Sequence, residues 1–210
     1  SSDLLAENVG YDSTTVKDTL DSLLYEAINI TSFTSNVAPV QEIGTNISSI
    51  TLTWKLSQPA TEQFINDVPV TGSSFTFDTL FNSNKSFTLK VNDGTTIKSK
   101  TIDIKFMNNI YYGVSSSTTY DSSFIESLTK ELRQATEMNF RVNAGKDEYI
   151  CFAYPSHYGE AVFSVGGFEG GFREVAKFYY TNESGYNEQY IVYCSDNPCL
   201  GDTRVKVIYV

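Results

Sequence analysis

The sequence has little of what catalytic and metal sites usually require. Its 210 residues include one histidine, one tryptophan, two methionines and three cysteines. A single histidine, His157, excludes metal sites built on several histidines and catalysis by paired histidines. The G-x-S-x-G motif of a serine nucleophile is also missing. We therefore expect a protein that is not an enzyme and that holds no cofactor and no metal.

Basic residues and long apolar runs are scarce as well. The chain has 15 lysines and arginines against 25 acidic residues, which gives a net charge of −10 and a pI near 4.5. This balance disfavours a surface that neutralises phosphates or binds an anionic membrane. No apolar run approaches the roughly 20 residues that span a bilayer, and Ser1–Gly10 lacks the basic and apolar regions of a signal peptide. We expect neither nucleic acid nor a membrane as a partner.

Small polar residues and aromatic residues are abundant. Ser, Thr and Asn account for 61 residues, and there are 14 Tyr and 14 Phe. Thr, Tyr and Phe suit a pleated, half-buried surface, whereas Ser and Asn suit the turns between strands. So many aromatic side chains also exclude a disordered chain. The composition therefore predicts a mainly β protein with hydroxyl-rich outer faces.

The segment 1–30 predicts one short helix. Its apolar residues recur at steps of three and four positions: Val16, Leu20, Leu23, Leu24 and Ala27. Thr15 with Asp18 approximates a capping box, and residues 12–14 offer further caps. A helix of about ten to fourteen residues is marginal in isolation. The apolar stripe must therefore be covered, either by the following domain or by copies of the helix in other subunits.

From 31 to 107 the apolar period changes to two. Ile50, Leu52 and Trp54 alternate with threonines, and Asn92-Asp93-Gly94 predicts a hairpin turn. Several short strands with a tryptophan on an early one favour an immunoglobulin-like or fibronectin-like β-sandwich. No cysteine pair lies in this range, so an antibody-type domain is not expected.

The remainder, 108–210, predicts a C-terminal sandwich-like β domain with one helix. Asp121 or Ser123 caps this helix, with Glu126 as the capping-box partner of Ser123. The apolar face of the helix consists of Ile125, Leu128 and Leu132. Strands are expected at Asn139–Val142, Tyr149–Tyr154, Ala161–Val165, Glu174–Tyr180, Gln189–Cys194 and Arg204–Val210.

The three cysteines leave two interpretations open. Cys194 and Cys199 bracket a short turn that a disulfide would close in an oxidising setting. The interpretation that we favour is three free thiols, two of them buried in strands and one in a loop. One such pair in a chain with a single histidine is poor support for a zinc site.

The glycine-rich string VGGFEGGF, at Val165–Phe172, allows two interpretations. It lacks the lysine of a phosphate-binding loop, and no helix follows whose N-terminus would bind an anion. We favour a tight bend in which Phe168 and Phe172 anchor the loop in the core. The alternative is a glycan-binding loop whose exposed aromatic rings stack on sugars.

A second aromatic string reads YPSHYG. It contains the single histidine and has the composition of a turn between strands. Its candidate contact residues for a glycan or receptor are Tyr154, His157 and Tyr158.

Ala6–Asp12 and Thr15–Leu24 follow the pattern A-x-N-V-x-Y-D and T-V-K-x-x-L-D-x-L. This pattern resembles a stretch that is common in bacteriophage fibre proteins. The range 30–114 is similar to the Ig-like module of phage structural proteins, and so are the string at 165–172 and the tail from Tyr193. Cys194 and Cys199 depart from the family, in which polar or small residues are expected at these positions.

The resemblance implies a homotrimeric fibre on the head or tail of a virion. The segment 1–30 would be a collar in which Val16, Leu20, Leu23 and Leu24 join three chains, and its N-terminal end would meet other virion proteins. The β domains would then contact host glycans or surface proteins. The alternative is a secreted bacterial carbohydrate-binding or adhesion module without catalytic activity. A glycan-degrading depolymerase is disfavoured because no β-helical repeat is visible.

Overall fold

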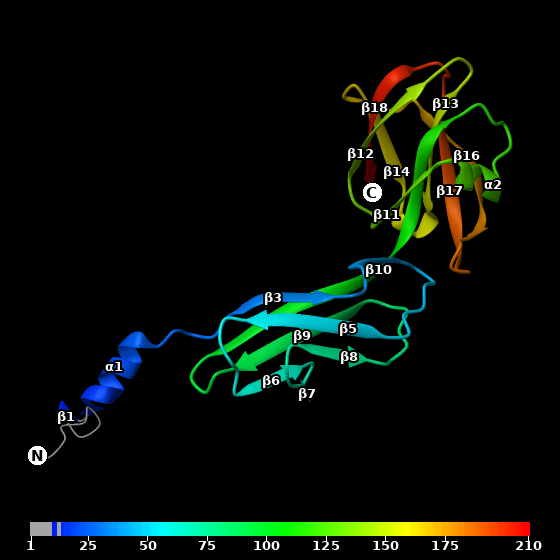
Figure 1. Cartoon of the computed structure of the whole chain (residues 1–210). Coiled ribbons are helices and arrows are strands. Elements are labelled where there is room, and N and C mark those ends of the chain that lie inside the picture. The colour runs from blue at the N-terminus through cyan, green and yellow to red at the C-terminus, as the bar shows by residue number, and fades with distance from the viewer. Residues whose placement is uncertain (1–9, 12–13) are drawn as a thin grey trace, which may run out of the picture. The chain divides into compact units, whose positions relative to one another are not determined.

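The computed structural model of the chain describes residues 10–11 and 14–210 (Figure 1). The caps expected at Asp12 and Ser13 lie outside the described residues. Of the residues that the structure describes, 56% lie in strands and 9% in helices, so the expected mainly β class with β-sandwich architecture is confirmed.

The helical elements are α1 (Val16–Leu24), α2 (Ser122–Ser127) and the 3₁₀ turn η2 (Ser156–Tyr158). The strands up to the middle of the chain are β1 (Gly10–Tyr11), β2 (Thr14–Thr15), β3 (Ile30–Ser35), β4 (Val40–Glu42), β5 (Ile50–Leu56), β6 (Glu62–Ile65), β7 (Val68–Pro69), β8 (Ser74–Phe77), β9 (Lys85–Asn92) and β10 (Ile97–Ser115). The later strands are β11 (Thr129–Arg133), β12 (Met138–Ala144), β13 (Tyr149–Pro155), β14 (Ala161–Val165), β15 (Phe168–Glu169), β16 (Phe172–Thr181), β17 (Asn187–Ser195) and β18 (Gly201–Tyr209).

The chain groups into two compact units. The first unit combines Ser1–Asn36, Thr51–Phe77 and Ser86–Ile102, and the second combines Val37–Ile50, Asp78–Lys85 and Asp103–Val210. Strand β10 belongs to both, because it continues without a break for 19 residues. The boundary that the sequence placed between 107 and 108 lies inside this strand.

The first unit is an immunoglobulin-like sandwich. One sheet has the order β3-β5-β8, and the other is formed by β10, β9, β6 and β7 (Figure 1). The alternation expected along β5 is confirmed, because Ile50, Leu52 and Trp54 are each at most 1% exposed. The indole N–H of Trp54 donates to the side-chain oxygen of Gln63 at 2.6 Å, so burial leaves this donor satisfied.

The expected turn at 92–94 joins β9 to β10 and gathers donors around one carboxylate. Asp93 accepts hydrogen bonds from the backbone N–H groups of Thr96 at 2.7 Å, Thr95 at 2.9 Å and Ile28 at 3.0 Å. The Tyr25 hydroxyl donates to the same carboxylate at 2.8 Å. The Thr96 N–H, followed by the other donors, holds the pKa of Asp93 far below its usual range. The segment before β3 is thereby tied to the hairpin.

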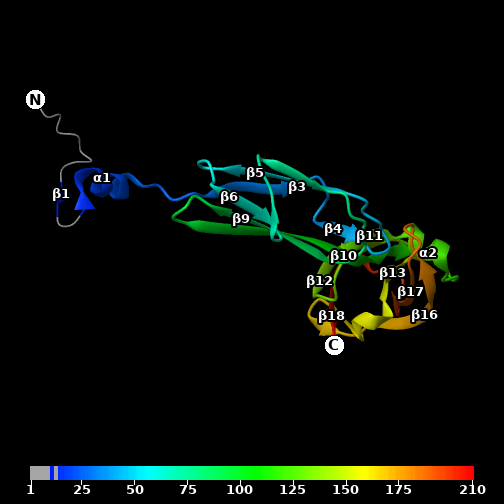
Figure 2. The same ribbon diagram turned by 90° about the horizontal axis from the view of Figure 1, so that it is seen from below.

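The second unit is also a two-layer β-sandwich. One layer contains β16, β17, β13, the C-terminal part of β10, and β11, and the other has the order β12-β18-β14-β15 (Figure 2). Between the layers lies an aromatic and aliphatic core that includes Phe140, Phe152, Phe163, Val205 and Val207.

Helix α2 covers the opposite face of the first layer. Its Phe124 and Ile125 are buried in a second cluster with Tyr111, Tyr180 and Tyr190. Asp121 caps the helix, as expected, by accepting from the Phe124 N–H at 3.0 Å.

The expected extent of this helix was wrong. The backbone becomes extended at Leu128, and Leu132 lies in β11, which pairs with β10. The backbone N–H and C=O groups of Thr129–Arg133 form hydrogen bonds with β10, which satisfies them as well as a further helical turn would. The helical spacing of Ile125, Leu128 and Leu132 therefore did not determine where the helix ends.

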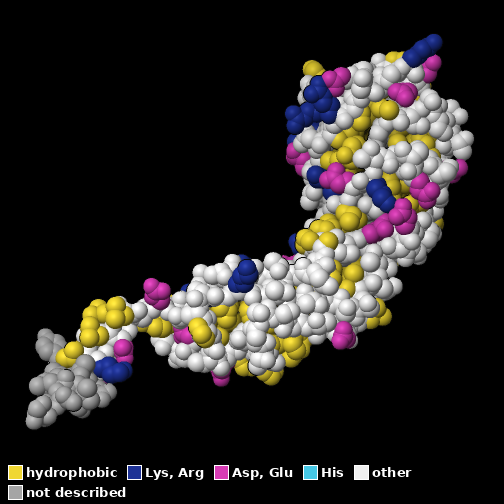
Figure 3. Space-filling model, in the orientation of Figure 1, with side chains coloured by type: hydrophobic (Ala, Val, Ile, Leu, Met, Phe, Trp, Pro, Cys, Tyr) yellow, Lys and Arg dark blue, Asp and Glu magenta, His cyan; other side chains and the backbone are white. Residues whose placement is uncertain are grey.

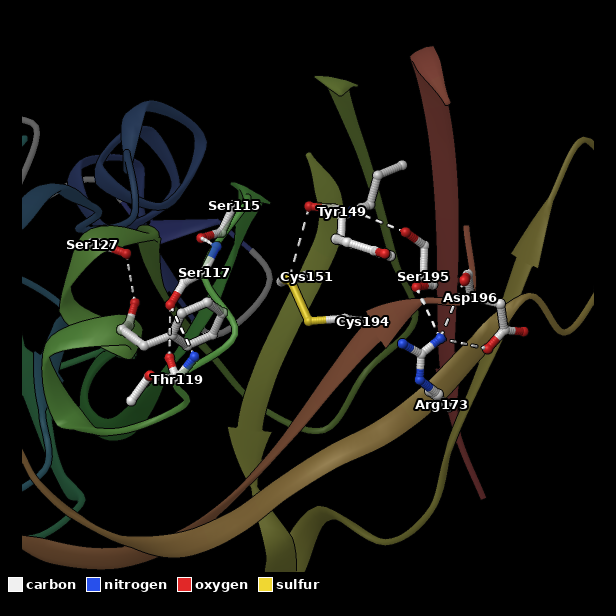
Figure 4. The surroundings of a disulfide bond; sticks show 12 residues. Ser115, Ser117, Thr119, Ser127, Tyr149, Cys151, Arg173, Cys194, Ser195 and Asp196 are labelled. Atoms are coloured by element: carbon white, nitrogen blue, oxygen red, sulfur yellow. Dashed lines mark hydrogen bonds and ion pairs between the residues drawn. A yellow bond between two sulfur atoms is a disulfide. The ribbon is translucent and has the colours of Figure 1, made fainter. Parts of the chain in front are cut away.

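The second unit contains one disulfide, between Cys151 and Cys194 (Figure 4). These residues face each other in the antiparallel pair β13–β17. The favoured interpretation of three free thiols is therefore wrong, and so is the Cys194–Cys199 alternative. Cys199 is exposed and free, and its sulfur accepts the Asp147 N–H at 3.1 Å. The register between two strands, rather than the spacing along the chain, selects the partner of Cys194.

Candidate attachment surfaces

Helix α1 presents an apolar stripe to solvent. The side chains of Leu20, Leu23 and Leu24 are 47%, 77% and 76% exposed, and Val16 is partly buried. No residue of α1 is buried by any described part of the chain. The leucines of the predicted trimerisation stripe thus lie on one side of α1 and are exposed to solvent in the single chain.

The start of α1 is fixed by the expected capping box. The Asp18 N–H donates to the Thr15 hydroxyl oxygen at 3.1 Å, and the Thr15 N–H donates to the Asp18 carboxylate at 3.2 Å. The hydrogen bond from the Thr15 side chain lowers the pKa of Asp18. These contacts set the phase of the helix, and hence the direction in which its leucines point.

The structure separates the three residues of the second aromatic string. Tyr154 is fully buried, and its hydroxyl donates to the Gly159 carbonyl at 3.2 Å, so it belongs to the core rather than to a contact surface. Burial raises the pKa of this phenol. His157 and Tyr158 remain accessible on the 3₁₀ turn, with the rings edge to face at 4.7 Å.

A hollow of about 250 Å³ lies beside His157 and Tyr158. Asn108 and Gln134 give it polar edges, and Phe106 and Tyr186 add two further rings. The Tyr158 hydroxyl donates to a backbone carbonyl at 2.6 Å, and burial raises its pKa. The hollow therefore combines aromatic rings with side-chain amides and an imidazole. This combination suits a small polar ligand with an apolar face.

The glycine-rich hairpin differs from the favoured interpretation at one of its two aromatic residues. Gly166 and Gly167 have φ values of 60° and 87°, so they form a two-residue turn of positive φ between β14 and β15. Phe172 is half-buried and stacks on Phe163 at 4.5 Å, but Phe168 is 81% exposed. The prediction that Phe168 anchors the loop in the core is wrong, because β15 has two residues and no described element packs over it.

The sequence reasoning missed a polar face on the same sheet. Along β12, β18 and β14, buried residues alternate with more exposed ones except at the last residues of β18 and β14, so the outward side chains form one surface. Figure 3 shows lysine and arginine side chains gathered on the side of this unit where Figure 1 draws β12 and β18. The alternation in Arg204-Val205-Lys206-Val207 was the signal in the sequence that pointed to this face.

Among residues 10–11 and 14–210, no three His, Cys, Asp or Glu side chains gather as they would around a metal ion. None of the described helices is long and apolar enough to cross a bilayer. No family model, curated protein or solved structure matches the chain.

Proposed function

We propose that this protein is a structural component of a bacteriophage particle, a trimeric fibre displayed on the head or tail that attaches to host glycans or surface proteins. Its N-terminal segment joins three chains and meets other virion proteins, and its β units face outward without catalytic activity. The exposed apolar stripe of α1 is the observation that carries this proposal. The phage assignment rests on the resemblance of 6–12 and 15–24 to fibre collars.

The energetics favour covering of the stripe by other copies of α1. Burying a leucine side chain contributes about 1.5–3 kcal/mol, and Leu20, Leu23 and Leu24 are available in each chain. A helix of nine residues is too short to be stable alone in water. Three copies around one axis would bury the stripe and stabilise the helix at the same time.

The first test is the mass in solution. Each chain has a mass of 23.4 kDa, so light scattering should give about three times this value for the native protein. The variant Leu20→Asp/Leu23→Asp should fall to the mass of one chain with an unchanged far-UV spectrum of the β units, because buried aspartates would repel each other.

A matched control places a negative charge on the polar face of α1. Ser22→Asp should keep the trimer, since Ser22 lies on the side of the helix opposite the stripe. A native mass of one chain, or a Leu20→Asp/Leu23→Asp variant that stays trimeric, would contradict the trimer.

The second test addresses the particle itself. Gold-labelled antibodies against the second unit should decorate intact virions on the head or the tail. Labelling that is absent from particles but present on bacterial surfaces would overturn the phage assignment in favour of a secreted adhesion module.

A further inference from the structure

The outer face of the sheet β12-β18-β14-β15 carries a row of polar side chains. Asn139 on β12 pairs with Lys206 on β18, which pairs with Ser164 on β14, which in turn pairs with Glu169 on β15. Four different hydrogen-bonding groups therefore stand side by side across four strands. Their chain neighbours Met138, Phe140, Phe163, Val205 and Val207 are at most 5% exposed, which fixes the outward direction of the row.

The adjacent row holds an unfavourable pair of like charges. Arg141 on β12 lies directly opposite Arg204 on β18, and like charges in this position destabilise a sheet. Arg141 is neutralised by a bidentate ion pair with Asp202. Lys206, in the first row, is paired with Glu137 at 2.9 Å.

Arg204 is exposed, and its guanidinium has no ion pair or hydrogen bond within the described part of the chain. Its charge is therefore not used in any pair within this part of the chain. An exposed guanidinium without an internal partner is available to an anionic group of a ligand.

A groove of about 620 Å³ opens beside Arg204. One of its walls is the turn Gly166–Gly167, where an added Cβ would meet no atom within 4 Å. These glycines allow the turn its positive φ, and their missing side chains leave the groove open. Its volume lies within the range of about 300–1,000 Å³ that is usual for ligand sites.

The chemistry of the groove selects its ligand. A guanidinium fork binds a carboxylate through two parallel hydrogen bonds. The amide of Asn139, the hydroxyl of Ser164 and the carboxylate of Glu169 match the hydroxyl groups of a sugar. Because the Glu169 carboxylate only accepts hydrogen bonds, it suits sugar hydroxyls and not a further anionic group, so the groove fits a ligand with a carboxylate at Arg204 and hydroxyls beside it.

We propose that this groove binds an acidic saccharide, with Arg204 holding the sugar carboxylate and Asn139, Ser164 and Glu169 holding its hydroxyls. The inference rests on the proposed attachment function, for which it names the ligand class. Each groove lies within one chain, so a trimer would present three copies of it.

Calorimetric titration of the full chain tests the proposal with two acidic probes, trigalacturonic acid and 3′-sialyllactose. Their neutral counterparts are methyl-esterified trigalacturonic acid and the methyl ester of 3′-sialyllactose. At least one acidic probe should bind about tenfold or more tightly than its counterpart, since a charge-assisted pair is lost in the neutral sugar.

Arg204→Gln should weaken binding by about tenfold to a hundredfold. The matched control is Arg173→Gln. Arg173 lies on β16, outside the groove, and is paired with Asp196, so the loss of its charge should leave binding unchanged. Equal affinity for acidic and neutral probes, unchanged binding by Arg204→Gln, or no binding of either acidic probe would overturn the proposal.

The same titration with Leu20→Asp/Leu23→Asp separates this inference from the proposed function. A monomeric variant should retain the affinity of each groove, because no residue of α1 lines it. Failure of the trimer and failure of the groove are therefore distinguishable results.

Discussion

At the residue scale, Asp93 links a local turn to a distant segment. Its carboxylate satisfies the turn residues Thr95 and Thr96, and it also accepts from Ile28 and Tyr25, which precede β3. An Asp-Gly turn requires only the first set of contacts. The contacts with Ile28 and Tyr25 explain why an aspartate at this position stabilises the first unit and not the hairpin alone.

The ionised form of Asp93 should make the first unit sensitive to acid. Its pKa is lowered on folding, so its contribution is present above the ordinary aspartate pKa of about 4 and is lost as the pH falls below that value. Asp93→Asn should be less stable than the native chain at pH 7, with a smaller loss of stability between pH 4 and pH 2. Urea unfolding followed by Trp54 fluorescence measures both effects, and parallel pH profiles for the two proteins would contradict the prediction.

At the element scale, the segment after β4 is bound to the turn between β16 and β17. The Ser184 hydroxyl donates to Glu42 at 3.2 Å, and the Asn182 side chain donates to the Ile43 carbonyl at 2.8 Å. Gly44 lies at the centre of this contact with φ of 95°, and a Cβ there would come within 2.8 Å of the Tyr186 Cβ. Both its backbone conformation and its close approach therefore require glycine.

Gly44→Ala should destabilise the second unit by about 1–3 kcal/mol through backbone strain, and the clash with Tyr186 adds to this loss. The matched control is Gly170→Ala in the same unit, where φ is 105° but no atom lies within 4 Å of the added Cβ. Urea unfolding of both variants should show the larger loss for Gly44→Ala. Equal losses would mean that the contact with Tyr186 contributes nothing.

At the scale of the whole molecule, the two units carry separate spectroscopic reporters. Trp54, the single tryptophan, is buried in the first unit. The second unit contains the disulfide and the edge-to-face cluster of Tyr111, Tyr180 and Tyr190, whose centroids are 5.4–5.9 Å apart. Fluorescence and near-UV circular dichroism therefore follow different parts of the chain.

Removing the disulfide should affect one unit selectively. Cys151→Ala/Cys194→Ala should cost the second unit about 2–4 kcal/mol, because the cross-link restricts the unfolded chain. The unfolding transition seen by the near-UV circular dichroism of the tyrosines should move to a lower urea concentration. The midpoint of the transition seen by Trp54 fluorescence should not change. Cys199→Ala, which removes the free thiol, should leave both unchanged. If both transitions move together in the double variant, the units unfold as one.

The sequence by itself determined the features that depend on neighbours along the chain. The alternation at Ile50–Trp54, the turn at Asp93 and the caps at Thr15 and Asp121 are local patterns, and the structure contains each of them. Their physical basis is the two-residue period of a strand and the unsatisfied N–H groups at the start of a helix. The mainly β class followed from these patterns and from the composition.

The tertiary structure decided everything that depends on register and coverage. It paired Cys151 with Cys194, placed Leu132 in a strand, exposed Phe168 and set Arg204 opposite Arg141. Which residues face each other depends on how distant strands align, and a shift of one position would reverse every side chain. The groove at Arg204 exists because β12, β18, β14 and β15 pair in one particular register. The identity of the residues alone does not specify that register.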